Sequence, residues 1–165
     1  KSTLDENISS NFPHEFPFKK KEGKINEKNF DENAKQEFLK GAKTAYEMII
    51  TNFANGKLKE IKTLLDKKTY QQFDEAIRER ISKNILSETT FIGIDSAEIK
   101  EHQQNKNMLE VTVEFVSEII SCIKDKDNKI ISGDPKKIKK VHDTWKFSKD
   151  SRSNNPNWFL IDTQA

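Results

Sequence analysis

The spacing of apolar residues changes once along the chain, near Asn84, and this change limits the fold more than any other feature. Before it, apolar residues recur every three or four positions, which is typical of amphipathic helices. After it, apolar and polar residues alternate, which is typical of strands with one buried face. Helices followed by strands predict an α+β domain in which the helices lie across one face of a sheet.

Three helices are predicted before the change. The first begins after Asp31, which can cap a helix, and ends at Asn55-Gly56. Part of its apolar face is made of small residues that would let another element approach closely: Gly41, Ala42 and Ala45. A short helix covers residues 58–65. The third helix starts near Thr69 as its N-cap, and its apolar stripe consists of Tyr70, Phe73, Ile77 and Ile81.

Four strands are predicted after the change, at residues 89–101, 108–124, 136–150 and 157–163. The polar turns between them are short, so neighbouring strands should be antiparallel. The two tryptophans of the chain, Trp145 and Trp158, fall on the last two strands, on either side of the polar run SKDSRSNNP. Alternation turns both rings toward the helices. The expected sheet therefore has about four antiparallel strands.

Large apolar side chains gather on the faces predicted to point inward, in a chain that contains eleven Phe. As a core, they need no further function. As the lining of an open groove between helix and sheet, they would suit an acyl chain or a hydrophobic peptide. Both interpretations stay open for this set, which consists of Tyr46, Ile49, Phe53, Phe73, Ile77, Phe91, Phe115, Asp143, Trp145, Phe147 and Trp158.

Asp143 is the one carboxylate in this set, because it alternates with Val141 and Trp145. Burial among rings would raise its pKa and suit it to act as an acid or base. The alternative is an Asp that is satisfied by a backbone amide or by a neighbouring side chain, for which the candidates are Tyr46, Arg78 and Arg80. No second acid or base is identifiable in the sequence, which favours this alternative.

Residues 1–33 lack sustained periodicity and are predicted to form an extension, with the α+β domain covering residues 34–165. Within the extension, aromatic side chains precede a lysine run: Phe12, Phe16, Phe18, Lys19, Lys20 and Lys21. A flexible linker with a solvated charge run is the favoured interpretation. The alternative is contact with an anionic lipid surface, where each nearby lysine contributes about 1 kcal/mol.

Several classes of site are not supported by the composition. The formal net charge of +2 gives no global basic field, so no nucleic-acid partner is predicted. Cys122 is the one cysteine, which excludes an internal disulfide and a thiolate cluster, and the three histidines lack metal-ligand spacing. We therefore predict no metal and no other cofactor. No apolar run approaches the roughly 20 residues that a membrane-spanning helix needs.

Four blocks of the chain resemble the Tim44-like domain family, the C-terminal domain of the import-motor scaffold of the mitochondrial inner-membrane translocase. They span roughly residues 38–163, and their amino-acid sequences are closer to the bacterial members of the family than to the mitochondrial ones. The last is the most distinctive, because a DxW and an NPNW are joined by a loop of matching length. The blocks are FLKGAKTAYEMIITNFANGKLKEIKTLLDKKTYQQF, TTFIGIDSAEI, VTVEFVSEIIS and GDPKK…VHDTWKFSKDSRSNNPNW.

This resemblance implies a cone-like α+β fold similar to nuclear transport factor two and the cystatins, with a curved sheet wrapped around a long helix. It also implies a peripheral membrane role in protein transport. In mitochondrial members, amphipathic helices at the start of the domain recruit it to anionic lipid. No clear pair of such helices is visible here before Asp31.

The resulting prediction is a non-enzymatic scaffold or adaptor domain in protein transport or in the organisation of inner-membrane complexes. It would bind lipid or a partner protein through an apolar groove. The alternative is a protein that binds a small molecule or lipid in its pocket, such as an isomerase-like enzyme with Asp143 as acid or base. The expected location is the inner membrane of a bacterium, either peripheral or tethered by a segment upstream of Lys1.

Overall fold

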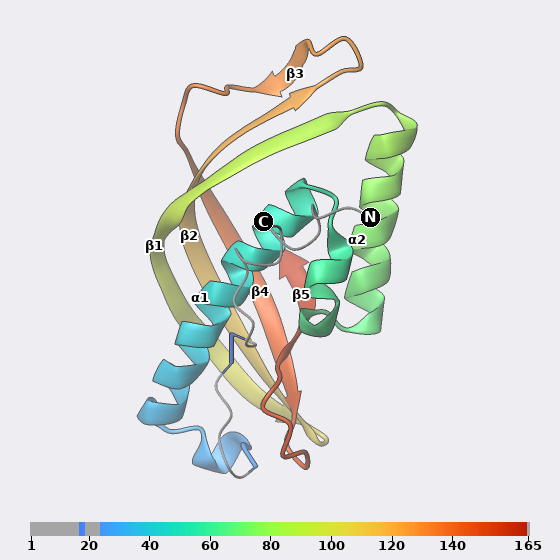
Figure 1. Ribbon diagram of the computed structural model, residues 1–165. Helices are drawn as coiled ribbons and strands as arrows, with labels where there is room; N and C mark the ends of the chain where they lie inside the picture. Colours follow the sequence, from blue (N-terminus) through green and yellow to red (C-terminus); the bar gives the residue numbers. More distant parts are fainter. Residues whose placement is uncertain (1–16, 19–23, 165) are drawn as a thin grey trace, which may run out of the picture.

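The computed structural model describes residues 17–18 and 24–164, in which helices precede strands as predicted (Figure 1). The helical elements are the 3-10 helix η2 (Glu27–Asn29), α1 (Glu32–Ala54), the 3-10 helix η3 (Leu58–Leu64) and α2 (Lys67–Ser82). The strands are β1 (Leu86–Asn105), β2 (Met108–Lys124), β3 (Ile130–Gly133), β4 (Lys139–Asp150) and β5 (Phe159–Gln164). The α+β class is confirmed.

Helix α1 begins and ends where the sequence predicts. Asp31 is the N-cap, and its carboxylate accepts a hydrogen bond of 2.9 Å from the backbone amide of Ala34. A cap of this kind stabilises a helix by about 1 kcal/mol. At the other end, Gly56 has a φ of +72°, a left-handed conformation that glycine adopts without strain.

Helix α2 begins at Lys67, before the predicted N-cap. Asp66, not Thr69, caps the helix, because its carboxylate accepts a hydrogen bond of 2.9 Å from the amide of Thr69. Thr69 therefore lies inside the first turn and is buried. The predicted apolar stripe also ends early, since Ile81 is 68% exposed. Asp and Thr are both good N-caps, so residue preference alone does not separate the two positions.

The strands form one antiparallel sheet in the order β1-β2-β4-β5, and β3 pairs with β2 beyond the end of β4. Each predicted strand is present, and β2 has the predicted limits. The sheet has five strands rather than about four. The additional strand, β3, has four residues that are all exposed, so it lacks the alternation by which a strand is identified in a sequence.

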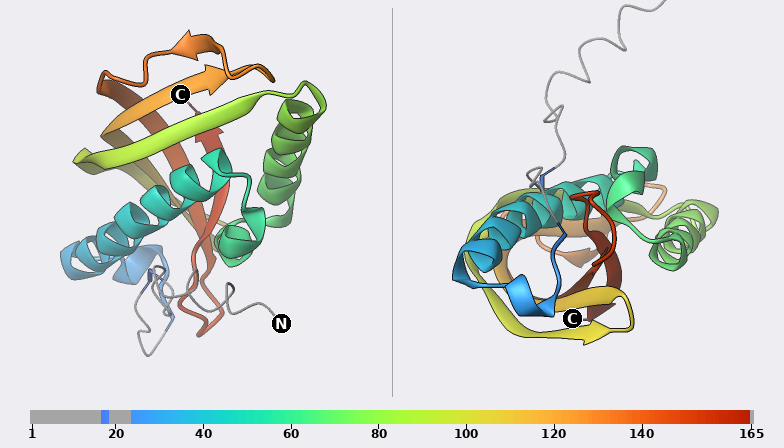
Figure 2. Two further views of the ribbon diagram at one scale, coloured as in Figure 1. Left: turned by 45° about the horizontal axis from the view of Figure 1, so that its top comes forward. Right: turned by 90° about the horizontal axis from the view of Figure 1, so that it is seen from below.

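The sheet bends around α1, as the view from below shows (Figure 2). The bend coincides with three shifts of register between β1 and β2, at which Ile92, Asp95 and Lys100 have no partner opposite them. Each such bulge adds one residue to β1 alone, which bends the strand and increases its twist. The concave face of the sheet therefore closes over α1 and forms the core with it.

Two aromatic residues that precede the predicted domain boundary at residue 34 belong to this core. Phe18 is 5% exposed and Phe30 is 4% exposed. Their rings lie 6.1 Å from the ring of Phe38 on α1. A Cβ atom on Gly41 would lie 2.3 Å from the Phe18 ring, so the small face predicted for α1 is the surface on which Phe18 packs. The folded unit thus includes residues that we had assigned to the extension.

Phe18 was also predicted to contact a membrane, and its packing corrects this prediction. Its ring is covered by α1 and the sheet and is not accessible to a membrane. The other residues predicted to contact a membrane lie outside the described part of the chain: Phe12, Phe16, Lys19, Lys20 and Lys21. Within residues 17–18 and 24–164, no helix is long and apolar enough to cross a membrane.

Candidate functional site

The inward-facing set predicted from the sequence comes together between the helices and the sheet. Most of its members are at most 7% exposed: Tyr46, Ile49, Ile77, Phe115, Trp145, Phe147 and Trp158. The others are half-buried: Phe53, Phe73, Phe91 and Asp143.

The rings of this set fill the interior by packing against one another. Tyr46 stacks on Phe115, with ring centroids 4.2 Å apart and planes 17° apart, and the Trp145 ring lies 4.6 Å from Tyr46. Pairs of this kind contribute about 0.5–1.5 kcal/mol each beyond the area they bury. Trp158 lies 4.6 Å from Phe38 and packs at the other end of α1. These residues are the core of the domain.

Phe53 and Phe73 make a separate contact between α1 and α2, with ring centroids 4.8 Å apart. The guanidinium of Arg80 lies 4.9 Å from the centroid of Phe53 and donates a hydrogen bond of 2.7 Å to the Phe53 carbonyl. Burial lowers the pKa of Arg80. Arg78 points elsewhere and pairs with Asp74 at 2.9 Å. Neither arginine is the partner of Asp143.

The partner of Asp143 is Tyr46. Asp143 lies on β4 opposite Phe115 of β2, on the face of the sheet that α1 covers. The Tyr46 hydroxyl donates a hydrogen bond of 2.5 Å to Oδ2 of Asp143 and lies 2.9 Å from Oγ of Ser117. One phenol on α1 therefore links the helix to two strands. We call Tyr46, Ser117 and Asp143 the tyrosine network.

Burial controls the protonation of this network. It raises the pKa of Asp143 above the ordinary value of 3.8, while the hydrogen bond from Tyr46 and the charge of His142 act in the opposite direction with smaller effect. Burial also raises the pKa of Tyr46, and its hydrogen bond to Asp143 raises it further. The phenol therefore stays protonated at neutral pH and remains the donor of the network.

The chemistry available to this network is limited. Tyr46 and Ser117 are completely buried, their hydroxyl groups lie against each other, and the Tyr46 hydroxyl also donates to Asp143. Among the described residues, no group of three or more His, Cys, Asp or Glu side chains is placed to hold a metal ion. Cys122 is buried, with its Sγ 3.8 Å from Oε2 of Glu88. The tyrosine network therefore has the features of a structural link between helix and sheet.

Two surface clefts lie outside the tyrosine network. A cleft of about 550 Å³ runs between the first half of α1 and β1, with Leu39 and Ile99 among charged residues such as Lys35 and Glu101. A second cleft, of about 320 Å³, lies between residues 56–60 and α2. Of the set predicted to line an apolar groove, only Ile77 reaches either of these two clefts, namely the second.

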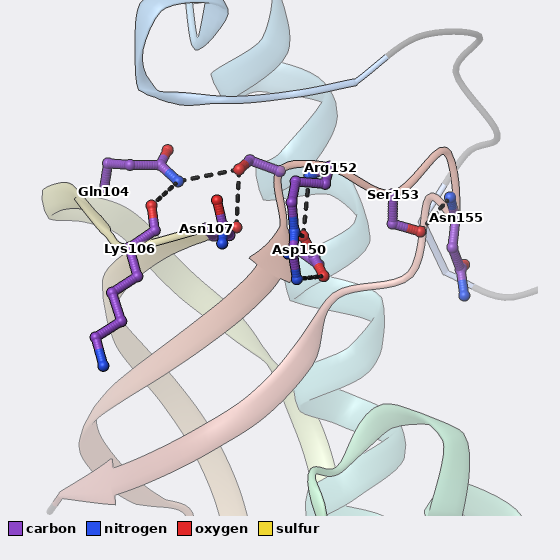
Figure 3. A network of polar contacts seen from close by, with 8 residues as sticks. Gln104, Lys106, Asn107, Asp150, Arg152, Ser153 and Asn155 are labelled. Atoms are coloured by element: carbon purple, nitrogen blue, oxygen red, sulfur yellow. Dashed lines mark hydrogen bonds and ion pairs between the residues drawn. The ribbon is translucent and has the colours of Figure 1, made fainter.

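The predicted loop between the last two strands folds against the turn between β1 and β2 (Figure 3). Nε2 of Gln104 donates a hydrogen bond of 3.0 Å to Oγ of Ser151, which donates in turn to the carbonyl of Asn107 at 2.8 Å. At the start of the loop, Arg152 pairs with Asp150, the last residue of β4, at 3.2 Å. These contacts join the tips of two hairpins into one polar end of the molecule.

An exposed apolar surface at the opposite end of the sheet is absent from our predictions. Around β3, Ile130 is 44% exposed, Ile131 is 57% exposed and Ile138 is 59% exposed. The stretch KIISGDPKKIKK, at residues 129–140, carries a signal that could have revealed it, since its isoleucines stand between lysines with no helical or strand period. We call residues 124–140 the β3 tip.

Comparisons with known proteins place the chain by family rather than by a characterised relative. No curated protein matches it. Among solved structures, the intermembrane-space region of the chloroplast protein ARC6 is 12% identical, with a TM-score of 0.46, and the match covers 74% of this chain and 94% of that chain. RPA3114, a SEC-C motif protein from Rhodopseudomonas palustris, is 12% identical, with a TM-score of 0.41 and coverage of 74% and 76%.

A periplasmic fragment of TraM is 10% identical, with a TM-score of 0.39, and the match covers 66% of this chain and 77% of that chain. Similarity at this level does not extend to function. The family comparison covers more of the chain: the Tim44-like domain matches residues 21–165, which include the tyrosine network, the β3 tip and all of the core described above except Phe18. The chain belongs to the Tim44-like domain family.

Proposed function

We propose that this chain is a non-enzymatic adaptor domain that works at a membrane surface, within the protein-transport or complex-organising role that its family suggests. The observation that carries the proposal is the tyrosine network. Its one carboxylate accepts a hydrogen bond from a completely buried phenol, and the surrounding rings pack against one another. Binding through the surface of the domain is therefore favoured over chemistry in its interior.

The alternative of an isomerase-like enzyme is less well supported. A general acid or base has to lie within hydrogen-bond reach of the group it protonates or deprotonates. Asp143 is directed at Tyr46, and the other partner of the Tyr46 hydroxyl, Ser117, has no exposed surface. An apolar groove between helix and sheet is also disfavoured as the binding site, because the rings expected to line it are core residues.

The inner membrane of a bacterium remains the location that we propose, with an anionic lipid surface and a membrane-complex protein as partners. The segment that contains Phe12, Phe16 and Lys19–Lys21 is one candidate for the lipid contact. It combines aromatic and basic residues, the combination that favours the interface of an anionic bilayer.

Flotation with lipid vesicles tests the membrane part of this proposal. We expect the full chain to float with vesicles of phosphatidylethanolamine, phosphatidylglycerol and cardiolipin, and not with vesicles of phosphatidylcholine alone. Added salt should weaken the binding, because it screens the attraction between lysines and anionic headgroups. The Asp143→Asn variant should float like the unmodified chain, since its half-buried side chain lies on the face of the sheet that α1 covers. Failure of the unmodified chain to float with the anionic vesicles would contradict the proposal.

A further inference from the structure

The β3 tip is the most exposed part of the described chain that carries large apolar side chains. Every residue from Lys126 to Lys140 is exposed, including the three isoleucines of the tip. In Figure 1, β3 stands at the end of the molecule opposite η2 and the turn between β1 and β2. Exposed apolar side chains gathered at one end of a domain mark an interaction surface more often than scattered ones do.

The charge of the β3 tip identifies the kind of partner. Residues 124–140 contain seven lysines and three aspartates, a formal net charge of +4 in a chain whose total is +2, so the rest of the chain is net negative. Within the described part of the chain, Lys124, Lys137 and Lys140 take part in ion pairs. The other lysines of the tip have no ion-pair partner there: Lys126, Lys129, Lys136 and Lys139.

The backbone holds these side chains in a defined arrangement. Leu86 of β1, Lys124 of β2 and Ile130 of β3 are successive partners across three strands, so they share one face of the sheet. Leu86 is 51% exposed, which extends the apolar surface of the tip onto β1. Gly133 lets β3 lie close against β2, with which it pairs, since a Cβ atom there would lie 2.4 Å from the carbonyl oxygen of Ser121. The tip is therefore an ordered hairpin and not a loose loop.

We infer that the β3 tip is the membrane-contacting surface of this domain and that it docks on a bilayer of anionic lipid. Isoleucine side chains enter the boundary between headgroups and acyl chains, while the surrounding lysines lie against the headgroup phosphates. A second copy of the chain suits this surface less well, because a symmetric contact would bring two tips of charge +4 together. This inference rests on the proposed membrane role and names the surface that performs it.

Variants of the full chain test the inference by flotation with vesicles of phosphatidylcholine and phosphatidylglycerol. One variant replaces the isoleucines of the tip (Ile130→Ser, Ile131→Ser, Ile138→Ser), and a second replaces its unpaired lysines (Lys126→Gln, Lys129→Gln, Lys136→Gln, Lys139→Gln). Each lysine near an anionic surface contributes about fivefold to binding, and the isoleucines contribute by burying apolar surface at the headgroup boundary. We therefore expect each variant to bind at least about tenfold more weakly. Circular dichroism checks that both variants keep the fold, as expected for exposed positions.

A charge-matched control replaces four exposed lysines on the helices: Lys40→Gln, Lys43→Gln, Lys67→Gln and Lys68→Gln. It removes the same charge from another surface and should bind like the unmodified chain. A second comparison, Lys19→Gln, Lys20→Gln and Lys21→Gln, tests the N-terminal lysine run. If only this last variant loses binding, or if all variants bind equally, the β3 tip is not the docking surface although the membrane role stands. If the unmodified chain does not bind, both the inference and the membrane role fail.

A fluorescent label gives a direct test of contact. An environment-sensitive fluorophore on Ile131→Cys, in a Cys122→Ser background, should shift its emission to the blue when anionic vesicles are added. The same label on Lys28→Cys, in η2 at the opposite end of the molecule, should not shift. A shift at position 28 without one at position 131, while the protein is bound, would overturn the inference.

Discussion

Tyr46 joins three elements of the fold: α1, β2 and β4. Its ring stacks on Phe115 of β2, and its hydroxyl contacts Ser117 and Asp143 on two different strands. An unsatisfied buried polar group costs about 1–3 kcal/mol, so removing one phenol oxygen affects both of its partners.

The Tyr46→Phe variant should therefore lower the free energy of unfolding by about 1–3 kcal/mol, measured by urea denaturation. The Tyr70→Phe variant is the matched control, because the Tyr70 hydroxyl makes no hydrogen bond within the described part of the chain and should change stability little. Equal losses in the two variants would show that the network does not contribute as we describe.

Asp143 gives stability a definite dependence on pH. Its pKa in the folded chain lies above the ordinary value of 3.8, so the folded state binds this proton more tightly than the unfolded state does. The contribution of Asp143 to stability is then complete below pH 3.8 and is lost as the pH rises through the raised pKa. Asparagine does not ionise, so the Asp143→Asn variant does not lose stability at this position as the pH rises. Relative to the unmodified chain, its free energy of unfolding should rise over that pH window, as chemical denaturation at several pH values would show. Parallel curves would contradict the raised pKa.

At the scale of single residues, the sequence predicts which way a side chain faces better than it predicts which residue that side chain contacts. Alternation along the strand turns Asp143 inward, and the structure places it there. Its partner was one of three candidates, because Tyr46 is 97 residues away in the chain and no local pattern connects the two positions. The N-cap of α2 is predicted at Thr69 and lies at Asp66 for a different reason. Both residues take part in the same hydrogen bond, in which the backbone amide of Thr69 donates to the carboxylate of Asp66.

Among the elements, α1 was the easiest to predict and β3 the hardest. Helix α1 has a cap, a long apolar stripe and a terminating glycine, which are all local signals. Strand β3 has four exposed residues, so its position depends only on its pairing with β2. The bulges of β1 are hard to predict for the same reason, because they depend on the register between β1 and β2 and not on the residues of β1 alone.

The contact between α1 and the segment of Phe18 leads to a prediction for Gly41. An alanine here would favour the helix by roughly 0.5–1 kcal/mol, but its Cβ atom would meet the Phe18 ring and the carbonyl of Pro17. The Gly41→Ala variant should therefore lower the melting temperature. A Phe18→Ala background lacks the ring, which removes much of the steric conflict with the Cβ atom at position 41. We expect the same alanine to be less harmful there or to raise the melting temperature. An equal effect in both backgrounds would contradict the packing of Phe18 on α1.

For the whole molecule, the folded unit begins earlier than the change of period indicates. Phe18 and Phe30 lie in the core, and removing a buried Phe side chain costs about 3–5 kcal/mol. Domains of this size are stable by only about 5–15 kcal/mol. The sequence did not show this, because the segment before Asp31 has no periodicity of its own and is held by contacts with α1 and the sheet.

A chain that starts at Asp31 should therefore melt at a much lower temperature than the full chain, or show no cooperative transition by calorimetry. The full chain with Phe18→Ala and Phe30→Ala is the control. It should lose a similar amount of stability if these two rings account for the effect. A truncated chain that melts like the full chain would show that the predicted boundary at residue 34 is the correct one.

Strand β2 runs for 17 residues and is paired with β1 along its whole length. At about 3.3 Å per residue, its path measures at most about 55 Å. The turn between β1 and β2, at residues 105–108, and the turn between β2 and β3, at residues 125–129, therefore lie at opposite ends of this one strand. If the β3 tip rests on lipid, a partner that binds the turn at residues 105–108 is held several nanometres above the bilayer. The paired strands β1 and β2 then act as a spacer, and their length sets the height at which that partner is held.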